Sequence, residues 1–201
     1  MLNFDTVENF ETILAEFYSA PYAVATDSCT HAVELCLRYK NITQASCPVN
    51  TYLSIPMTFE KLNVEWNFRE QQWQDYYNIA ENIYDAAVLW KEGSYIPNSF
   101  MCISFQFRKH LGLGRGGLIL CNYYKDYVNL KKMSYDGRLP KVPWAEQNVD
   151  CLGYHYYMTP ETAQLGIEKF KTAKDTQPKI WTWKDYPRLA DMKIFKGKDV
   201  K

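Results

Sequence analysis

The sequence has no excess of charge of either sign. Its 201 residues include 23 Lys plus Arg and 23 Asp plus Glu, so the formal net charge is zero. A chain with this balance has no overall electrostatic attraction to nucleic acid or to an anionic membrane surface. We therefore expect neither nucleic acid nor a membrane as a partner.

Long hydrophobic runs and paired cysteines are also absent from the sequence. No apolar run approaches the roughly 18 residues that cross a bilayer, and the N-terminal stretch MLNFDTVENF lacks the basic head and apolar region of a secretory signal. The 6 cysteines form no C-x-x-C pair and lie mostly in apolar surroundings, as reduced core thiols do. These features predict a soluble, cytoplasmic protein.

Motifs for metal and serine hydrolase chemistry are missing as well. The sequence contains neither H-E-x-x-H nor G-x-S-x-G, and its three histidines (His31, His110 and His155) are scattered. We expect no metal site.

Helical and strand patterns alternate along the chain. At 47% hydrophobic residues, the chain can bury roughly 70% of its unfolded surface in one core. The alternation predicts an α/β fold, a mostly parallel sheet covered by helices. The expected strands lie at 22–26, at 45–49, just before Asp85, within 99–107 and at 117–121. The expected helices are one that ends at Ala20-Pro21, one that carries Ala32, Val33, Cys36 and Leu37, and three more over 51–62, over 125–133 and from Thr159-Pro160.

A glycine motif, G-x-G-x-x-G, occurs at Gly112, Gly114 and Gly117. A dinucleotide-binding loop requires a helix after the glycines, because the pyrophosphate rests on the helix N-terminus. The following residues, LILC, read as a strand instead. The motif therefore indicates a shaped turn, and Lys109, just before it, becomes the residue of interest.

Three predicted strand ends carry reactive groups, and ligand sites in α/β sheets gather at such ends. The segment TDSCTH begins a helix whose N-terminus suits a phosphate, Asp85 offers a fixed negative charge, and Lys109 offers an amine that can form a Schiff base. Pyridoxal phosphate requires these three groups. Taken singly, each group has a simpler explanation. The segment TDSCTH and Asp85 could each serve only as a helix cap, and Lys109, beside Arg108 and His110, could belong to an exposed basic loop.

Several longer segments resemble one family in chain order: PYAVATDSCTHAVEL, CPVNTYLSIPMTF, NIYDAAVLW, ISFQFRKHLGLGRGGLILC and GYHYYMTPETAQLGI. The fourth sets Ser104 and Lys109 at the family's five-residue separation. The chain resembles the DegT/StrS-type sugar aminotransferases, pyridoxal-phosphate enzymes of the aspartate-aminotransferase fold (fold type I). The resemblance implies an aminotransferase that moves an amino group from an amino acid, such as glutamate, to a nucleotide-linked keto sugar.

The resemblance also implies roles for single residues. Lys109 and Asp85 are implied as catalytic, the first as the Schiff-base lysine and the second as partner of the pyridinium nitrogen. The other implied cofactor-binding residues are Cys29 and Thr30 in the phosphate cradle, Ser104 on the phosphate, Tyr52 against the ring, and His155, which in a homodimer with shared active sites would reach the phosphate of the neighbouring subunit.

The chain departs from the family pattern in several places. Val88 replaces a hydrogen-bonding residue, Arg115 replaces an acidic residue in the glycine loop, and Tyr157 replaces an arginine. The chain is also short, which predicts a trimmed cofactor-binding domain over 1–170 and a C-terminal segment over 171–201 that docks on it, with the family's small C-terminal domain nearly absent.

Two alternatives follow from these departures. A catalytically silent member could use the basic, aromatic residues from 169 to 201 to bind a partner. The second alternative is a pyridoxal-phosphate sugar dehydratase. Some relatives of that kind carry histidine in place of the lysine, and in this chain His110 lies next to Lys109.

Overall fold

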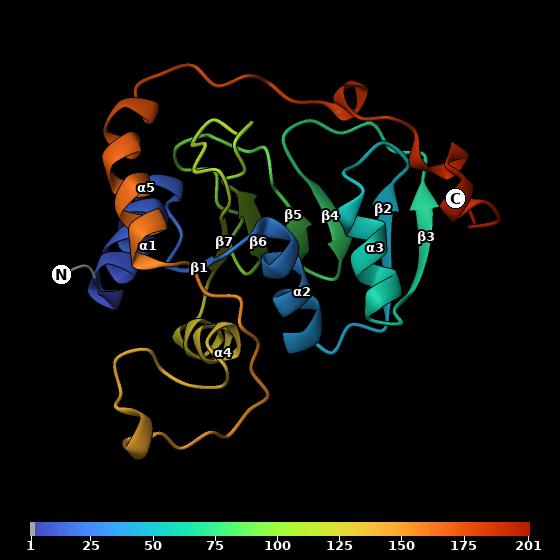
Figure 1. The fold of residues 1–201 in the computed structure, drawn as a ribbon. Helices are drawn as coiled ribbons and strands as arrows, with labels where there is room; N and C mark the ends of the chain where they lie inside the picture. The colour runs from blue at the N-terminus through green and yellow to red at the C-terminus, as the bar shows by residue number, and fades with distance from the viewer. Residues whose placement is uncertain (1–2) are drawn as a thin grey trace.

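A computed structural model describes residues 3–201, which form an α/β fold around a central sheet (Figure 1). Within this part of the chain, the central sheet has the strand order β1-β7-β6-β5-β4, and β2 and β3 form a separate parallel pair. The strands are β1 (Tyr22–Thr26), β2 (Gln44–Pro48), β3 (Glu65–Arg69), β4 (Tyr77–Ala80), β5 (Ile83–Asp85), β6 (Phe100–Ser104) and β7 (Gly117–Cys121).

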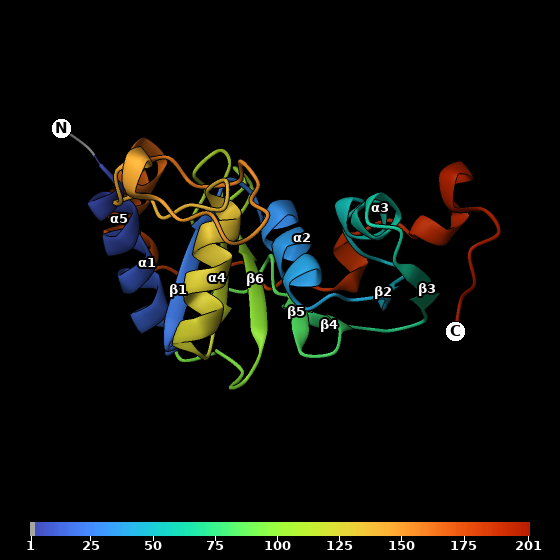
Figure 2. The ribbon, with the colours of Figure 1, turned by 90° about the horizontal axis from the view of Figure 1, so that it is seen from below.

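Helices cover the sheet. Helices α1 and α5 pack against each other next to β1, whereas α2 contacts β6 and β7, and α3 lies against β2 and β3 (Figures 1 and 2). The helices are α1 (Phe4–Tyr18), α2 (Cys29–Tyr39), α3 (Ser54–Lys61), α4 (Tyr124–Ser134) and α5 (Pro160–Ala173), with short 3-10 helices η1 (Trp144–Glu146), η2 (Trp183–Asp185), η3 (Leu189–Asp191) and η4 (Lys193–Phe195).

The central strands are buried on both faces. Along β6, Met101 and Ile103 pack with α1 residues, whereas Cys102 packs in a second cluster with residues of α2. Because successive side chains of a strand point to opposite faces, an almost continuous apolar strand belongs between two helical layers. The apolar runs in the sequence therefore explain why the sheet lies in the middle.

The predicted α/β class and the helical cover are confirmed, but the central sheet is mixed rather than mostly parallel, since among its described strands only the β5–β6 pair is parallel. Strands β1, β5 and β6 share one direction, whereas β7 and β4 run against their neighbours. The β4–β5 connection is a two-residue turn, Glu81-Asn82, and tight turns join antiparallel strands. The direction of a strand thus depends on its connection, which alternation alone does not report.

Most predicted elements lie where the sequence pattern places them, and two strands were missed. β1 covers 22–26, and Thr159 caps α5 by accepting from the Thr162 N–H at 3.3 Å. In β3, Trp66 and Phe68 are buried between more exposed neighbours, an alternation that indicates a half-covered strand. β4 has only four residues, which leaves too little pattern to detect.

After α5 the chain crosses the top of the molecule to β2 and β3 (Figure 1). Backbone hydrogen bonds hold it there: Trp183 N donates to Trp73 O at 3.1 Å, and Leu189 N donates to Val49 O at 2.7 Å. Further along, Lys201 N donates to Phe68 O at 2.9 Å, so the C-terminal segment is anchored at several points. No helix within residues 3–201 combines the length and the hydropathy that crossing a bilayer demands.

Candidate functional site

A cavity of about 600 Å³ lies at the carboxyl ends of β1, β5 and β6, and the C-terminal segment forms part of its wall. This is the edge of an α/β sheet at which ligand sites are expected. Six of the seven predicted cofactor-binding residues line it: Cys29, Thr30, Tyr52, Asp85, Ser104 and Lys109. Segments far apart in the sequence thus meet around one space.

The first turn of α2 forms one wall of the cavity. Ser28 is the N-cap, with extended backbone, and its hydroxyl accepts from the His31 N–H at 3.2 Å. The next N–H groups, of Cys29 and Thr30, have no partner inside the helix, and the positive end of the helix dipole lies there. Both residues line the cavity, so this wall is suited to a phosphate group.

Gly117 explains how this wall is placed. A Cβ at Gly117 would lie 2.4 Å from Cys29 N, so any side chain would push β7 away from the start of α2. Gly117 begins a strand, which confirms that the glycine motif is not a dinucleotide-binding loop.

The side chains of Cys29 and Thr30 point to different partners. The Cys29 thiol is buried and donates to Cys102 O at 3.4 Å, and burial raises its pKa well above the usual range. Thr30 donates through its hydroxyl to Ser54 Oγ at 2.9 Å. Cys29 therefore offers the cavity its backbone N–H rather than a reactive thiolate.

Asp85 is a buried carboxyl group at the end of β5. Its Oδ1 accepts from the Ala87 N–H at 2.9 Å, and its Oδ2 accepts from the Tyr77 hydroxyl, which in turn contacts Thr51. Burial raises the pKa of Asp85, although Tyr77, Ala87 and the positive charge of Lys109 oppose that shift. Among the described residues Asp85 has no ion-pair partner, so a cationic N–H brought into the cavity would stabilise its charged form.

Lys109 is half-buried on the loop between β6 and β7, where its N–H donates to Gln106 O at 2.8 Å. Burial lowers the pKa of its amine, and the nearby Lys179 lowers it further, against the attraction of Asp85. A lysine is nucleophilic only when neutral. The interpretation of Lys109 as an exposed basic residue is wrong, whereas its neighbour Arg108 is exposed.

Tyr52 and Ser104 occupy the edge and the floor of the cavity. Tyr52, between β2 and α3, is 58% exposed, so its ring is accessible to a ligand. Ser104 ends β6, and its hydroxyl accepts from the Gln106 N–H at 3.3 Å, which leaves its own proton available.

His155, a predicted cofactor-binding residue, and His110, the neighbour of Lys109, both lie outside the cavity. The His155 side chain is 72% exposed, and its Nδ1 lies 3.2 Å from Asp136 Oδ2. Its predicted contact with the phosphate of a neighbouring subunit stays a prediction. His110 faces α5, with Nε2 2.9 Å from Ala173 O, so it does not replace Lys109 in the cavity.

The C-terminal segment supplies a wall that the sequence did not indicate. Trp181, Asp185, Tyr186 and Pro187 all line the cavity. The Trp181 ring centroid lies 5.0 Å from Lys109 Nζ, and Asn50 Nδ2 donates to Tyr186 O at 3.0 Å. The aromatic residues of this segment were expected to dock on the domain, but which of them reach the cavity depends on the path of the chain.

Arg115 places a positive charge in the glycine loop, where the family resemblance leads us to expect an acidic residue, and an ion pair offsets that charge. Its guanidinium lies 2.8 Å from Asp27 Oδ2, at the rim of the cavity. Asp27 also lies 2.6 Å from His31 Nδ1. The positive charge in the glycine loop is therefore neutralised by a carboxylate two residues before the phosphate-binding turn.

One family model matches the N-terminal part of the chain. Residues 1–63 match the model of the DegT/DnrJ/EryC1/StrS aminotransferase family, a stretch that includes α1, β1, α2, β2 and α3. The chain resembles that family over this third of its length. Among curated proteins, none matches the sequence significantly.

Solved structures share the fold over most of the chain. A protein of Bacillus cereus ATCC 10987 assigned as a PLP-dependent aminotransferase matches with a TM-score of 0.70 at 17% identity, over 85% of this chain and 59% of its own. Helicobacter pylori PseC, an aminotransferase involved in the biosynthesis of pseudoaminic acid, matches with a TM-score of 0.66 at 13% identity, over 84% and 58%. The sugar aminotransferase CalS13 from Micromonospora echinospora matches with a TM-score of 0.70 at 10% identity, over 85% and 61%. The chain thus has their fold and spans about three fifths of their length.

Proposed function

We propose that this chain is a pyridoxal-phosphate-dependent aminotransferase that transfers an amino group from an amino acid to a keto sugar. The observation that carries the proposal is the shared cavity of Asp85, Lys109 and the first turn of α2. The family resemblance over residues 1–63 and the fold of the solved aminotransferases support it.

The residues present fit this cofactor. The cavity of about 600 Å³ is within the range of small-molecule sites, roughly 300 to 1,000 Å³. The N–H groups of Cys29 and Thr30, with the Ser104 hydroxyl, would hold the phosphate. Asp85 would face the ring nitrogen, and Tyr52 would lie against the ring at the cavity edge.

Asp85 has a defined task in this arrangement. Its carboxylate, oriented by the Ala87 N–H and the Tyr77 hydroxyl, would hold a proton at the ring nitrogen. Such a charge-assisted bond contributes about 1.5 to 3 kcal/mol, and more where water is excluded. Bound pyridoxal phosphate supplies an aldehyde for the amine and a ring that accepts an electron pair.

Lys109 would act twice. Its amine, whose pKa burial lowers, would hold the cofactor and would also move a proton, as base and then as acid. Trp181 lies over the amine at 5.0 Å and would limit its path. The proton is therefore carried by one group with a lowered pKa.

The finer parts of the proposal concern substrates and assembly. By family analogy the donor is glutamate and the keto sugar is linked to a nucleotide. A cytoplasmic homodimer would complete each site with His155 of the second chain, since that exposed side chain lies outside the cavity of its own chain. In a trimmed domain over 1–170, the segment 171–201 would replace walls that a longer relative builds elsewhere.

A spectrum tests the proposal. The purified chain titrated with pyridoxal phosphate should develop the visible absorbance of the lysine-linked cofactor, and Lys109→Ala should not. The control is Lys184→Ala, which removes an exposed lysine of the C-terminal segment that does not line the cavity.

An unaltered spectrum in Lys109→Ala would remove that residue from its role. If the wild-type chain binds no pyridoxal phosphate at all, the proposal is wrong and the catalytically silent binding protein becomes the better account.

A further inference from the structure

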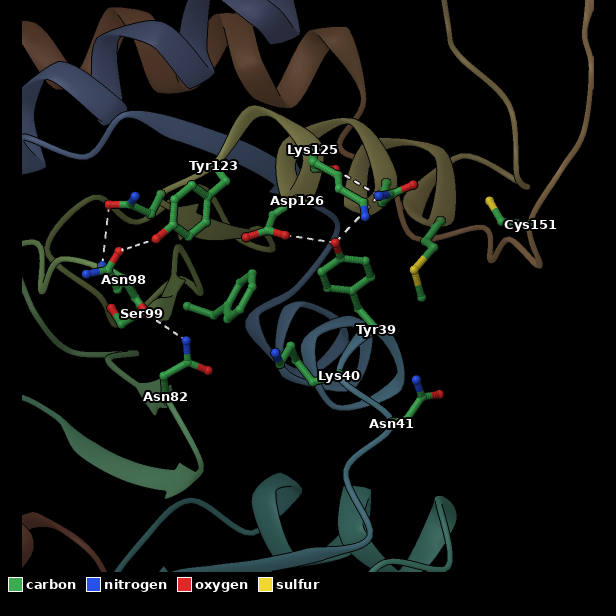
Figure 3. A pocket seen from close by; sticks show the side chains of 14 residues that line it. Tyr39, Lys40, Asn41, Asn82, Asn98, Ser99, Tyr123, Lys125, Asp126 and Cys151 are labelled. Atoms are coloured by element: carbon green, nitrogen blue, oxygen red, sulfur yellow. Dashed lines mark hydrogen bonds between the residues drawn. The ribbon is translucent and has the colours of Figure 1, made fainter.

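A second hollow of about 570 Å³ lies at the opposite edge of the central sheet (Figure 3). Asn82 precedes β5, Asn98 precedes β6, and Asn122 follows the antiparallel β7, so all three stand away from the carboxyl ends of β5 and β6. The C-terminal end of α2 and the start of α4 form the other side. We call this hollow the amide cleft, because five of its lining residues are asparagines.

On the sheet side, the amides are held in place by one another. The Tyr123 hydroxyl donates to Asn98 Oδ1 at 2.7 Å, Asn82 Nδ2 donates to Asn98 O at 2.5 Å, and Asn122 Oδ1 accepts from the Asn98 N–H at 3.4 Å. Asn98 has a positive φ of 61°, a conformation that asparagine tolerates better than most residues. These side chains are therefore ordered before any ligand arrives.

On the helical side, Tyr39 organises two polar residues of α4. Its hydroxyl donates to Asp126 Oδ1 at 2.8 Å and accepts from Asn129 Nδ2 at 3.5 Å. Asn129 Nδ2 also donates to Lys125 O at 2.9 Å. Figure 3 shows Tyr39, Lys125 and Asp126 grouped across the cleft from Asn82 and Asn98.

The ordered groups retain unused hydrogen-bonding capacity. Asn82 Oδ1 is buried and accepts no hydrogen bond among the described residues. A buried acceptor without a partner destabilises the fold, and a ligand hydroxyl that reached it would satisfy it. Asn98, through its Nδ2, and Asp126, through its Oδ2, make no hydrogen bond within residues 3–201 either, so donors and acceptors are interspersed.

The charges of the cleft disfavour an anionic ligand. No arginine lines it, and each of its two lysines lies close to an acidic residue: Lys40 lies 3.8 Å from Glu81, and Lys125 precedes Asp126 in the first turn of α4. The carboxylate of Asp126 belongs to the first turn of α4, where it occupies the position that a bound anion would favour. The lining therefore suits a neutral ligand that both donates and accepts.

An aromatic face completes this side. Tyr123 is 56% exposed, and its hydroxyl is fixed by Asn98, so the ring is held while its surface remains accessible. We propose that the amide cleft is a second binding site, separate from the Lys109 cavity, for a neutral sugar ring. Each sugar hydroxyl would pair with an amide donor and acceptor, and the apolar face of the ring would lie on Tyr123.

Calorimetric titration tests this proposal, with glucose, galactose, N-acetylglucosamine and the methyl glycoside of each as probes. The wild-type chain should bind at least one of them with a Kd on the order of 1 mM. Tyr123→Ala and Asn129→Ala should each weaken that binding by about tenfold or more. The matched controls are Tyr124→Ala, which removes the adjacent exposed tyrosine outside the cleft, and the exposed loop variant Asn148→Ala; both should bind as the wild type does.

Other outcomes locate the ligand elsewhere or identify its source. Absence of binding by every sugar, or binding of inorganic phosphate in their place, overturns the proposal. So does sugar binding that Trp181→Ala weakens and Tyr123→Ala leaves unchanged, because that result places the sugar in the Lys109 cavity. Equal binding of a sugar and its glycoside supports recognition of a sugar unit carried on a larger molecule, and binding of the free sugar alone supports a free metabolite.

Discussion

The Lys109 cavity and the amide cleft have nearly the same volume, about 600 and about 570 Å³, at opposite edges of one sheet. In the cavity, burial raises the pKa of Asp85 and lowers that of Lys109. In the cleft, neutral amides hold one another through hydrogen bonds. Perturbed ionisable groups are typical of catalytic sites, whereas a few fixed polar groups with free donors and acceptors are typical of binding sites. Two hollows of equal size therefore indicate different functions because of the groups that line them.

The largest expected effect separates the two regions directly. Lys109→Ala should lower turnover by roughly 10² to 10⁴-fold, because it removes the group that moves the proton. Tyr123→Ala in the cleft should leave turnover within about twofold. Steady-state rates with glutamate and a keto sugar nucleotide measure both. A loss in the cleft variant equal to that in the cavity variant would abolish the distinction.

Asp85→Asn should have opposite effects on activity and stability. Turnover should fall by about 10 to 100-fold, since a charge-assisted bond to the ring nitrogen is lost. Because burial raises the folded-state pKa of Asp85, stability is lost as pH rises through that pKa, and removing the charge restores it. The cofactor-free variant should melt higher at pH 7, by about 2 to 4 °C for each kcal/mol regained. The gain should vanish below about pH 4, where an unfolded aspartate is also protonated.

Lys109 should also determine the pH dependence of the rate. Burial lowers its folded-state pKa, so the neutral amine should be available below the usual lysine range. We expect kcat/KM to rise with pH along a limb that lies below that range. A limb at the ordinary lysine pKa would show that the amine is exposed to water.

The C-terminal wall should affect binding more than the chemical step. Trp181→Ala should raise the KM for the keto sugar by about tenfold and change kcat less, because uniform binding is lost. Trp183→Ala, in the same segment but outside the cavity, is the matched control and should change KM by less than about twofold. Equal KM values in the two variants would assign this wall to another part of the chain.

The smallest effect is expected at the rim. Arg115 is exposed, and its ion pair with Asp27 is solvated, so Arg115→Gln should change stability by less than about 1 kcal/mol. Thermal unfolding at low and at high salt measures this contribution. A loss of several kcal/mol would mean that the charge reversal in the glycine loop is structural.

Residue patterns predicted much of the site. The strand over 22–26, the capped α5 and the end of β5 at Asp85 are local features, and strand ends place Asp85 and Ser104 at one edge by a general rule. Strand β4 was missed because four residues carry little periodicity, whereas β3 was missed although Trp66 and Phe68 alternate with more exposed residues. The antiparallel direction of β4 depends on the tight turn at Glu81-Asn82.

By itself, the sequence determined the α/β class, the helix N-terminus at Ser28, the acid at Asp85 and the amine at Lys109, since each depends on neighbours within a few positions. Only the tertiary structure decided that Trp181 and Tyr186 would close the cavity, that Arg115 would meet Asp27, and that scattered asparagines would form one cleft. Those contacts join residues far apart in the chain. Long-range contacts depend on how the elements pack, and no local pattern of residues records that packing.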